Sequence, residues 1–252
     1  MDKTKIHGVM MDNVTMDEAL EYVAGRLDGT GTAKIYTPNS EIMMQAQRDP
    51  ELKRILNQAD LLIADGAGVV LASRILGRPL KEKVSGIDLV KRILENTEKR
   101  PISFFILGAR PGVAEMAAQN IISRYPGAEV KGTHHGYFNA EEEDLIIERI
   151  NKSGADILLV GLGAPKQEKW IHSNASRLNC KVAMGVGGSI DVLAGTAELA
   201  PEWMRRAGLE WLFRLIKEPR RFRRMLDLPR FVLLSIKRRL RPEAAHRKTS
   251  AK

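Results

Sequence analysis

The residues of this chain that could do chemistry stand in short motifs, each placed directly after a run of apolar residues. Asp65 follows the apolar run 61–64 and precedes Gly66, which lets the backbone turn sharply. A carboxylate at this point can act as a general base that takes a proton from a hydroxyl group. It can equally cap the helix that follows, since aspartate is common at helix starts. The residues alone leave both roles open.

A second motif, residues 37–41 with the sequence TPNSE, follows the apolar run 33–36. The side chains of Thr37 and Asn39 carry the groups needed to hydrogen-bond a sugar hydroxyl or a phosphate. Asn39 or Ser40 is also well suited to cap the next helix. Tyr137, which follows Gly136, has two possible roles as well: its ring can stack on a nucleotide base or occupy an ordinary strand end.

Two glycine-rich motifs have the composition of anion-binding turns. Residues 161–168 read GLGAPKQE, in which Gly163 permits close approach of a ligand to the backbone and the proline favours a helix start. Because the N-terminus of a helix attracts anions, Gln167 in the first turn can donate to a diphosphate. Residues 185–191 read GVGGSID, and there Asp191 can accept hydrogen bonds from a base or a ribose.

The elements that must position these motifs follow from the pattern of apolar residues. Short apolar runs bounded by Gly, Pro, Asn or Asp predict buried strands, and the amphipathic segments between them predict helices. This alternation predicts an α/β fold, a Rossmann-like, mostly parallel sheet with helices on both faces. Ligands of such sheets bind at the carboxyl ends of the strands, where every motif above falls. The predicted strands are 33–36, 61–64, 103–107, 157–160 and 182–186, and the predicted helices are 16–27, 40–47, 68–76, 87–98, 112–124, 140–151 and 166–177.

The C-terminal part of the chain is built differently from the rest. Residues 201–252 carry sixteen Lys or Arg against five Asp or Glu, whereas the whole chain has a net charge of only +9. Large apolar residues are interleaved with these charges at helical spacing, which is typical of a surface that meets an anionic lipid layer. The same stripe can instead pack on the main domain. We therefore predict an α/β catalytic core over 1–195 and a basic, amphipathic helical appendage over 196–252, with 242–252 disordered.

Composition disfavours several other classes of protein. No apolar run approaches the roughly 20 residues of a membrane-spanning helix, so membrane contact is predicted to be peripheral. Residues 1–13 lack the apolar core of a signal peptide and Cys180 is the only cysteine, which favours a cytoplasmic location. A nucleotide-dependent oxidoreductase is disfavoured because the dinucleotide-binding glycine fingerprint is missing. A nucleic-acid-binding protein is the main rival, but the appendage is more apolar than contact with phosphates requires.

Taken together and in this order, the motifs resemble one bacterial glycosyltransferase family. It includes the N-acetylmannosaminyltransferases of wall teichoic acid linkage-unit synthesis and the N-acetylmannosaminuronic acid transferases of enterobacterial common antigen. The resemblance covers about residues 5–235 and is nearer to the teichoic acid enzymes. One departure is Ile190, where an aromatic residue is expected. The segments that carry the resemblance are 37–39 (TPN), 64–66 (ADG), 161–168 (GLGAPKQE), 185–195 (GVGGSIDVLAG), 203–211 (WMRRAGLEW) and 214–220 (RLIKEPR).

The resemblance implies an inverting transfer that needs neither a metal nor a cofactor. UDP-N-acetylmannosamine would donate its sugar to N-acetylglucosamine on undecaprenyl diphosphate, with a β-1,4 linkage, at the inner face of the cytoplasmic membrane. Asp65 would be the general base that deprotonates the acceptor 4-hydroxyl. UDP-N-acetylmannosaminuronic acid is the alternative donor, no nucleic-acid partner is expected, and homo-oligomerisation stays open. Thr37 and Asn39 would line the sugar site, Tyr137, Gln167 and Asp191 would hold the uridine diphosphate, and Arg214, Arg221 and Arg224 would neutralise its charge.

Overall fold

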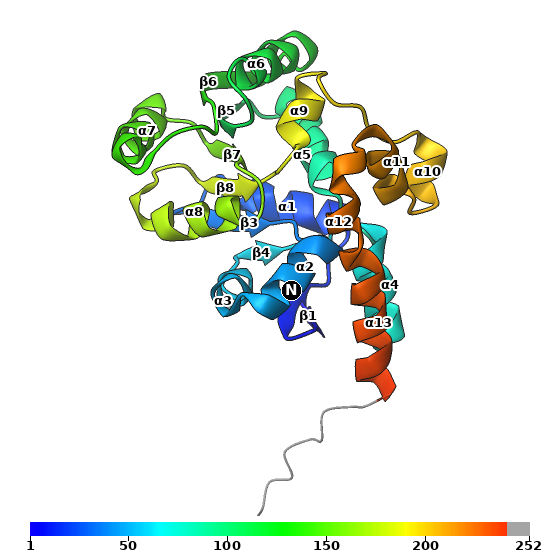
Figure 1. Cartoon of the computed structure of the whole chain (residues 1–252). Helices are drawn as coiled ribbons and strands as arrows, with labels where there is room; N and C mark the ends of the chain where they lie inside the picture. The colour runs from blue at the N-terminus through cyan, green and yellow to red at the C-terminus, as the bar shows by residue number, and fades with distance from the viewer. Residues whose placement is uncertain (241–252) are drawn as a thin grey trace, which may run out of the picture.

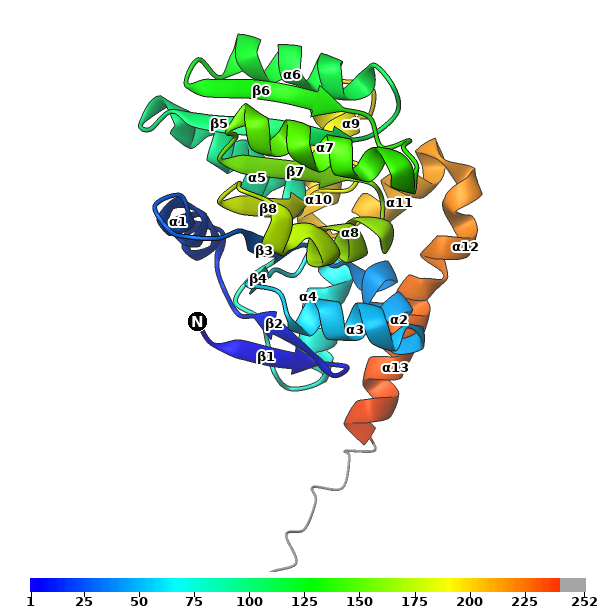
Figure 2. The same cartoon turned by 90° about the vertical axis from the view of Figure 1, so that its left-hand side faces the viewer.

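The computed structural model describes residues 1–240, and for Arg221 the backbone alone. Within these residues, six parallel strands form one sheet in the order β4-β3-β8-β7-β5-β6 (Figures 1 and 2). The predicted Rossmann-like sheet is therefore confirmed. The strands are β3 (Ala33–Tyr36), β4 (Leu61–Leu62), β5 (Ile102–Gly108), β6 (Ala128–His134), β7 (Ile157–Gly161) and β8 (Val182–Gly185).

Apolar side chains project from both faces of the sheet, which explains why the central strands are continuous apolar runs. β5 is buried along its whole length, and its successive residues Phe104 and Phe105 enter opposite cores. Helices cover both cores, as predicted. The core around Phe104 is covered by α1 (Met16–Arg26), α5 (Gly86–Glu95), α6 (Val113–Arg124) and α9 (Ser189–Leu193), and the core around Phe105 by α2 (Ser40–Arg48), α3 (Pro50–Asn57), α4 (Ala67–Ile75), α7 (Ala140–Ser153) and α8 (Lys166–Asn174).

Some elements lie outside the predicted set. The edge strand β6 has partly exposed polar residues in place of an apolar run, because it pairs with a neighbour on one side only. β1 (Lys3–Ile6) and β2 (Val9–Asp12) form a separate antiparallel hairpin that turns through His7 and Gly8, both with positive φ. α3 begins at Pro50, where Asp49 accepts a bond from the amide of Leu52 at 3.0 Å. The predicted helices 87–98 and 166–177 end in short 3₁₀ turns, η1 (Asn96–Glu98) and η2 (Ala175–Arg177).

The C-terminal appendage passes along the carboxyl ends of the strands and then beside α2 and α4 (Figure 2). Figure 2 shows the strand arrowheads pointing to the side where α11 and α12 lie. The described part of the appendage therefore lies at the edge of the sheet where the motifs were predicted to gather. Its helices are α10 (Glu202–Arg206), α11 (Glu210–Lys217), η3 (Pro219–Arg221), α12 (Phe222–Met225) and α13 (Asp227–Leu240).

The last helix, α13, is firmly packed on the core. The side chains of Phe231 and Ser235 are completely buried there. Arg238 approaches Nδ1 of His7 at 3.1 Å, and Nε2 of His7 lies 2.7 Å from Oγ of Ser235, which donates to the carbonyl of Phe231 at 2.8 Å. Because a guanidinium only donates hydrogen bonds, Nδ1 must accept and the ring hydrogen must sit on Nε2. We call this contact the α13 anchor.

A second attachment lies near the start of the appendage. Arg205 of α10 forms an ion pair with Asp88 of α5, and Glu210 of α11 pairs with Lys83 at 2.6 Å. Between this attachment and the α13 anchor, the described side chains of α11 and α12 include no buried residue. The part of the appendage that carries the predicted arginines is therefore held at its two ends and packed loosely in between.

The sequence left open whether the apolar residues of the appendage pack on the main domain or face a lipid layer, and the structure divides them into a packed group and an exposed group. Met204 and Phe231 pack on the core, as the packing alternative expects. Trp203, Ile216 and Phe222 are 65%, 66% and 57% exposed, so they remain free for another surface. In the described residues no helix is long and apolar enough to cross a membrane. The segment predicted to be disordered, 242–252, lies outside the described residues.

Candidate active site

Asp65 lies just beyond the carboxyl end of β4, and its backbone amide bonds to the carbonyl of Pro38 at 3.2 Å. Gly66 follows with a φ of +96°, which turns the chain into α4. No side chain caps the N-terminus of α4. The carboxylate of Asp65 therefore does not cap the helix that follows it.

Asp65 lines a small pocket to which the core and the appendage both contribute. The pocket has a volume of about 90 Å³, enough for a few water molecules, each of which fills roughly 30 Å³ in the liquid. Its lining comes from the loops that follow β3 and β4 and from α11, α12 and the start of α13. Its lining consists of Asn39, Ser40, Glu41, Asp65, Gly66, Ala67, Gly68, Gly208, Glu210, Trp211, Arg214, Arg224, Met225 and Leu228.

The surroundings of Asp65 shift its protonation in opposite directions. Burial disfavours the charged form and raises the pKa of the carboxyl to about 6. The guanidinium of Arg214 acts against this rise, whereas the negative charge of Glu210 adds to it. The backbone amide of Gly86 and the ammonium of Lys83 also favour the ionised form. A carboxyl with a pKa near 6 is ionised at neutral pH and is still basic enough to take a proton from a hydroxyl group.

Two of the three predicted arginines are at this pocket. Arg214 and Arg224 both line it, and both are exposed enough to meet a ligand. Nε of Arg224 lies 3.6 Å from Glu41, which links α12 to the first turn of α2. The side chain of Arg221 lies outside the described part of the chain, although its backbone belongs to η3 between the other two. The chain thus brings a carboxylate from the core and guanidinium groups from the appendage to one place.

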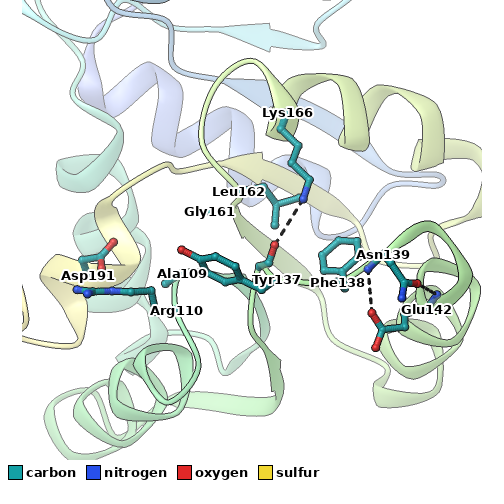
Figure 3. A pocket seen from close by; sticks show the side chains of 11 residues that line it. Ala109, Arg110, Tyr137, Phe138, Asn139, Glu142, Gly161, Leu162, Lys166 and Asp191 are labelled. Carbon is teal, nitrogen blue, oxygen red and sulfur yellow. Dashed lines mark hydrogen bonds between the residues drawn. The ribbon is translucent and has the colours of Figure 1, made fainter. Parts of the chain in front are cut away.

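A much larger cleft, of about 800 Å³, opens at the carboxyl ends of β5, β6 and β7 (Figure 3). The chain leaves β5 toward β6 and leaves β7 toward β8, on opposite sides, so this is a topological switch point of the sheet. Ligands of open α/β sheets bind at such points. The lining residues are Ala109, Arg110, Gly136, Tyr137, Phe138, Asn139, Glu142, Gly161, Leu162, Lys166 and Asp191.

Figure 3 shows how polar and aromatic groups are arranged around this cleft. Arg110 and Asp191 face each other at one end, with the ring of Tyr137 between them and the rest of the cleft. Tyr137 is 66% exposed, so its ring is accessible to a ligand. Nζ of Lys166 lies 4.9 Å from the centre of the Phe138 ring and 3.5 Å from the carbonyl of Gly136. The cleft thus offers two aromatic rings, two carboxylates and two cations.

The lining residues of the two cavities do not include Thr37 or Gln167, which are both buried. Both contact the turn that follows β8. Oγ1 of Thr37 donates to the carbonyl of Gly185 at 3.3 Å, and Oε1 of Gln167 accepts from the amide of Gly187 at 3.0 Å. The structure therefore brings these two predicted residues together as supports of one turn.

Asn39 and Gly163 take different positions. Asn39 caps α2, with its side chain accepting from the amide of Ile42 at 3.1 Å, and it also lines the Asp65 pocket. Asn39 can therefore cap α2 and still lie next to a ligand in the pocket, the two roles that the sequence left open. Gly163 is exposed with a φ of +77°, next to the cleft-lining Leu162. It has the open backbone that its motif suggested.

Sequence reasoning missed several residues at these cavities. Glu41 and Glu210 lie in segments from which the sequence analysis chose other residues. Glu41 is close to Arg224, and the charge of Glu210 acts on Asp65. Lys166 likewise lies within the glycine-rich motif 161–168, and Arg110 follows the predicted strand 103–107. Their signal was the position after a strand end, which they share with the residues that were chosen. In residues 1–240, no group of three or more His, Cys, Asp or Glu is placed to hold a metal ion.

Comparison of the sequence with known proteins identifies its family. The sequence profile of the glycosyl transferase WecG/TagA/CpsF family matches residues 4–245. Three curated relatives bear the name N-acetylglucosaminyldiphosphoundecaprenol N-acetyl-beta-D-mannosaminyltransferase. One from Bacillus spizizenii is 34% identical over 226 residues, covering 90% of this chain and 84% of the relative. One from Bacillus subtilis is 33% identical over 238 residues, with 94% and 92% covered, and one from Staphylococcus aureus is 35% identical over 232 residues, with 91% of each covered. With nearly its whole length matched, the chain belongs to the WecG/TagA/CpsF family of glycosyl transferases.

Proposed function

We propose that this protein transfers N-acetylmannosamine from UDP-N-acetylmannosamine to N-acetylglucosaminyl-diphospho-undecaprenol, a step in teichoic acid linkage-unit synthesis. The names of the relatives describe this acceptor and this sugar. The observation that carries the proposal is the single pocket lined by Asp65, Arg214 and Arg224. Sugar transfer from a nucleotide diphosphate needs a base for the acceptor and positive charge for the leaving group, and both meet at this pocket.

In the proposed reaction, Asp65 takes the proton of the acceptor 4-hydroxyl while that oxygen attacks the anomeric carbon of the donor. A new carbon–oxygen bond forms opposite the leaving group, so the configuration inverts and the product is β-linked. The bond from the anomeric carbon to the diphosphate breaks, and its electron pair stays on UDP. Arg214 and Arg224, joined in this proposal by Arg221, neutralise the growing charge, since guanidinium groups offer paired donors to phosphate oxygens and stay charged.

The large cleft is the proposed site of the uridine diphosphate. Its volume of about 800 Å³ falls in the usual range for pockets that hold small molecules. Tyr137 is placed to stack on the base, and Asp191 to accept from the base or the ribose. Lys166 and Arg110 add positive charge along the cleft. Thr37 and Gln167 would act from behind, through the turn that leads to Asp191.

The appendage is the proposed contact with the inner face of the cytoplasmic membrane. Trp203, Ile216 and Phe222 are exposed among arginines, a combination that favours anionic lipid surfaces. The pocket measures about 90 Å³, and in this proposal α11 and α12 move to enlarge it for the acceptor sugar. Membrane docking of these helices would couple that movement to the presence of the lipid-linked substrate.

The proposal is tested by measuring UDP release from purified protein with a short-chain lipid-diphosphate N-acetylglucosamine acceptor and a series of UDP-sugars. We expect release that depends on the acceptor and is fastest with UDP-N-acetylmannosamine. Faster release with UDP-N-acetylmannosaminuronic acid would assign the alternative donor, and no acceptor-dependent release with any donor would contradict the proposal. The reaction should continue in excess chelator.

The matched variant is Asp65→Asn, which keeps the shape of the side chain and removes its basicity. We expect unchanged UDP affinity by titration calorimetry and turnover lower by about 10²–10⁴-fold, the usual contribution of a general base. Turnover close to that of the wild type would remove Asp65 from this role.

A further inference from the structure

The turn after β8, residues 185–188, is held from two sides and leads into α9. Thr37 holds it from the end of β3, and Gln167 holds it from the start of α8 through the amide of Gly187. The carbonyl of Gly187 in turn faces Gly161, where an added Cβ would come within 2.8 Å of it. Because α9 carries Asp191 into the large cleft, the position of this turn determines the position of Asp191.

The amide of Gln167 is itself oriented by a neighbour. Its Nε2 donates to Oε1 of Glu168 at 2.9 Å, while its Oε1 accepts from Gly187 at 3.0 Å. Oε1 of Glu168 can accept this bond whether the carboxyl group is ionised or carries its proton on the unpartnered Oε2, so it selects the orientation of the amide in which Nε2 points toward Glu168 and Oε1 toward the turn. Space on the other side is limited, since a Cβ on Gly185 would lie 3.1 Å from Nε2 of Gln167.

Glu168 is energetically unfavourable at its buried position. Its side chain is 1% exposed, and its Oε2 is buried without a hydrogen-bond partner among the described residues. Burial raises the pKa of the carboxyl, which shows that the charged form is disfavoured here. An apolar side chain of similar size would avoid the cost of an unsatisfied polar atom. The stability of the fold therefore gives no reason for a carboxyl group at this position.

We propose that Glu168 is a positioning residue for donor binding: it fixes the amide of Gln167, which fixes the 185–188 turn and so the approach of Asp191 to the nucleotide. This rests on the proposed function in one respect, that the large cleft holds the UDP moiety. Glu168 has no contact with substrate in this account. It acts through Gln167 alone.

The test compares Glu168→Met with Glu168→Gln. Methionine fills the space without an acceptor of comparable strength, whereas glutamine can still accept from Gln167 through its own carbonyl. We expect Glu168→Met to fold with an unchanged or higher Tm and to weaken UDP binding about tenfold, the effect of one hydrogen bond of roughly 1.4 kcal/mol. The KM for the donor should rise by a similar factor while the KM for the acceptor stays constant. Glu168→Gln should restore UDP affinity to within about threefold of the wild type.

A double-mutant cycle shows whether Glu168 acts through Gln167. Glu168→Met should have little further effect on UDP affinity in a Gln167→Met background, because the amide it orients is gone. Tyr36→Phe is the control. It removes the hydroxyl that donates to the backbone carbonyl of Glu168 at 3.3 Å, and it leaves the bonds from Gln167 to Glu168 and from Gly187 to Gln167 intact. This variant should bind UDP as the wild type does.

Wild-type UDP affinity in Glu168→Met would overturn the inference. So would additive effects in the cycle, or a loss of affinity in Glu168→Gln that equals the loss in Glu168→Met. If Glu168→Met does not fold, Gln167→Met takes its place: weaker UDP binding is expected, and wild-type UDP affinity in that variant would overturn the inference. Failure of the proposed function would look different, since the wild-type protein itself would then not bind UDP.

Discussion

The carboxyl group of Asp65 shows how neighbouring charges can set the working range of a single residue. Burial is the largest influence on its pKa, and Arg214 and Glu210 act in opposite directions on it. Both neighbours belong to the appendage, so the basicity of a core residue depends on a segment that is attached from elsewhere. Only the ionised carboxylate accepts a proton, and for that reason this pKa sets the lower pH limit of the proposed reaction.

A pH–rate profile tests this dependence. Below about pH 6, kcat/KM of the wild type should fall about tenfold per pH unit as Asp65 becomes protonated. Glu210→Gln removes a negative charge that raises the pKa, so the falling limb should move to lower pH. Arg214→Gln removes a positive charge that lowers the pKa, so the limb should move to higher pH even though the rate is reduced throughout. An identical limb in all three proteins would mean that another group titrates.

Among the elements, α13 differs from the helices before it because it is fixed by a buried histidine. His7 is held as the neutral form with hydrogen on Nε2, and protonation of Nδ1 would turn the acceptor for Arg238 into a second donor. Burial is the main cause of a pKa of about 4 for His7, and the charges of Arg238 and Lys53 lower it further. The α13 anchor therefore depends on a neutral imidazole.

The sign of the pH effect follows from this shift. The unfolded chain binds a proton at His7 with a pKa near 6.5 and the folded chain only near 4, so the contribution of His7 to stability is present above pH 6.5 and is lost as the pH falls toward 4. His7→Gln keeps an acceptor and a donor but does not titrate. We expect its Tm to fall less than that of the wild type between pH 7 and pH 5, measured by circular dichroism. Parallel curves would show that His7 does not control this range.

The loosely packed helices α11 and α12 carry the exposed apolar residues that we assign to the membrane. Ile216→Ser and Phe222→Ser should each weaken co-sedimentation with vesicles of 30% anionic lipid by about fivefold to twelvefold, because each removes roughly 1–1.5 kcal/mol of apolar burial. Ile122→Ser is a matched control, since Ile122 is also more than half exposed but lies on α6 in the core. Equal losses in all three variants would mean that vesicle binding is not specific to the appendage.

At the scale of the whole molecule, the sequence predicts the architecture better than it predicts contacts. Parallel strands such as β5 are evident because burial on both faces demands an unbroken apolar run. The same reasoning does not find β6, because it is an edge strand with exposed glutamate and lysine. The motif residues could be placed at one edge of the sheet from the strand pattern. Which of them point into a cavity could not: Asn39 and Gln167 have similar side chains, yet one lines a pocket and the other is buried behind a turn.

The appendage shows a second limit of sequence reasoning. Phe231 and Ile216 contribute equally to an amphipathic stripe in the sequence, but one is completely buried on the core and the other is 66% exposed. Phe231 packs edge-on against the ring of His7, which lies between β1 and β2 more than two hundred residues earlier in the chain. No local pattern contains that information.

Amide hydrogen exchange followed by mass spectrometry would show how the molecule opens. Peptides from residues 210–225, which contain no buried described side chain, should exchange much faster than peptides from 228–236, which include Phe231 and Ser235. Anionic vesicles should change exchange in the first region and leave the second as it was. Uniform exchange across both regions would contradict attachment of the appendage through the α13 anchor.

Attachment of α11 and α12 at both ends has a kinetic consequence. In the proposed reaction, a segment tethered in this way would leave the pocket without diffusing away, so its guanidinium groups would meet a bound diphosphate at an effective concentration on the order of millimolar. Each of them can then bind weakly, releasing UDP after every turnover, and still engage the next donor within the nanoseconds to microseconds of a loop motion. Cations supplied by a separate molecule would have to bind UDP tightly to neutralise it, and tight binding would slow its release. Cations on the same chain avoid this conflict.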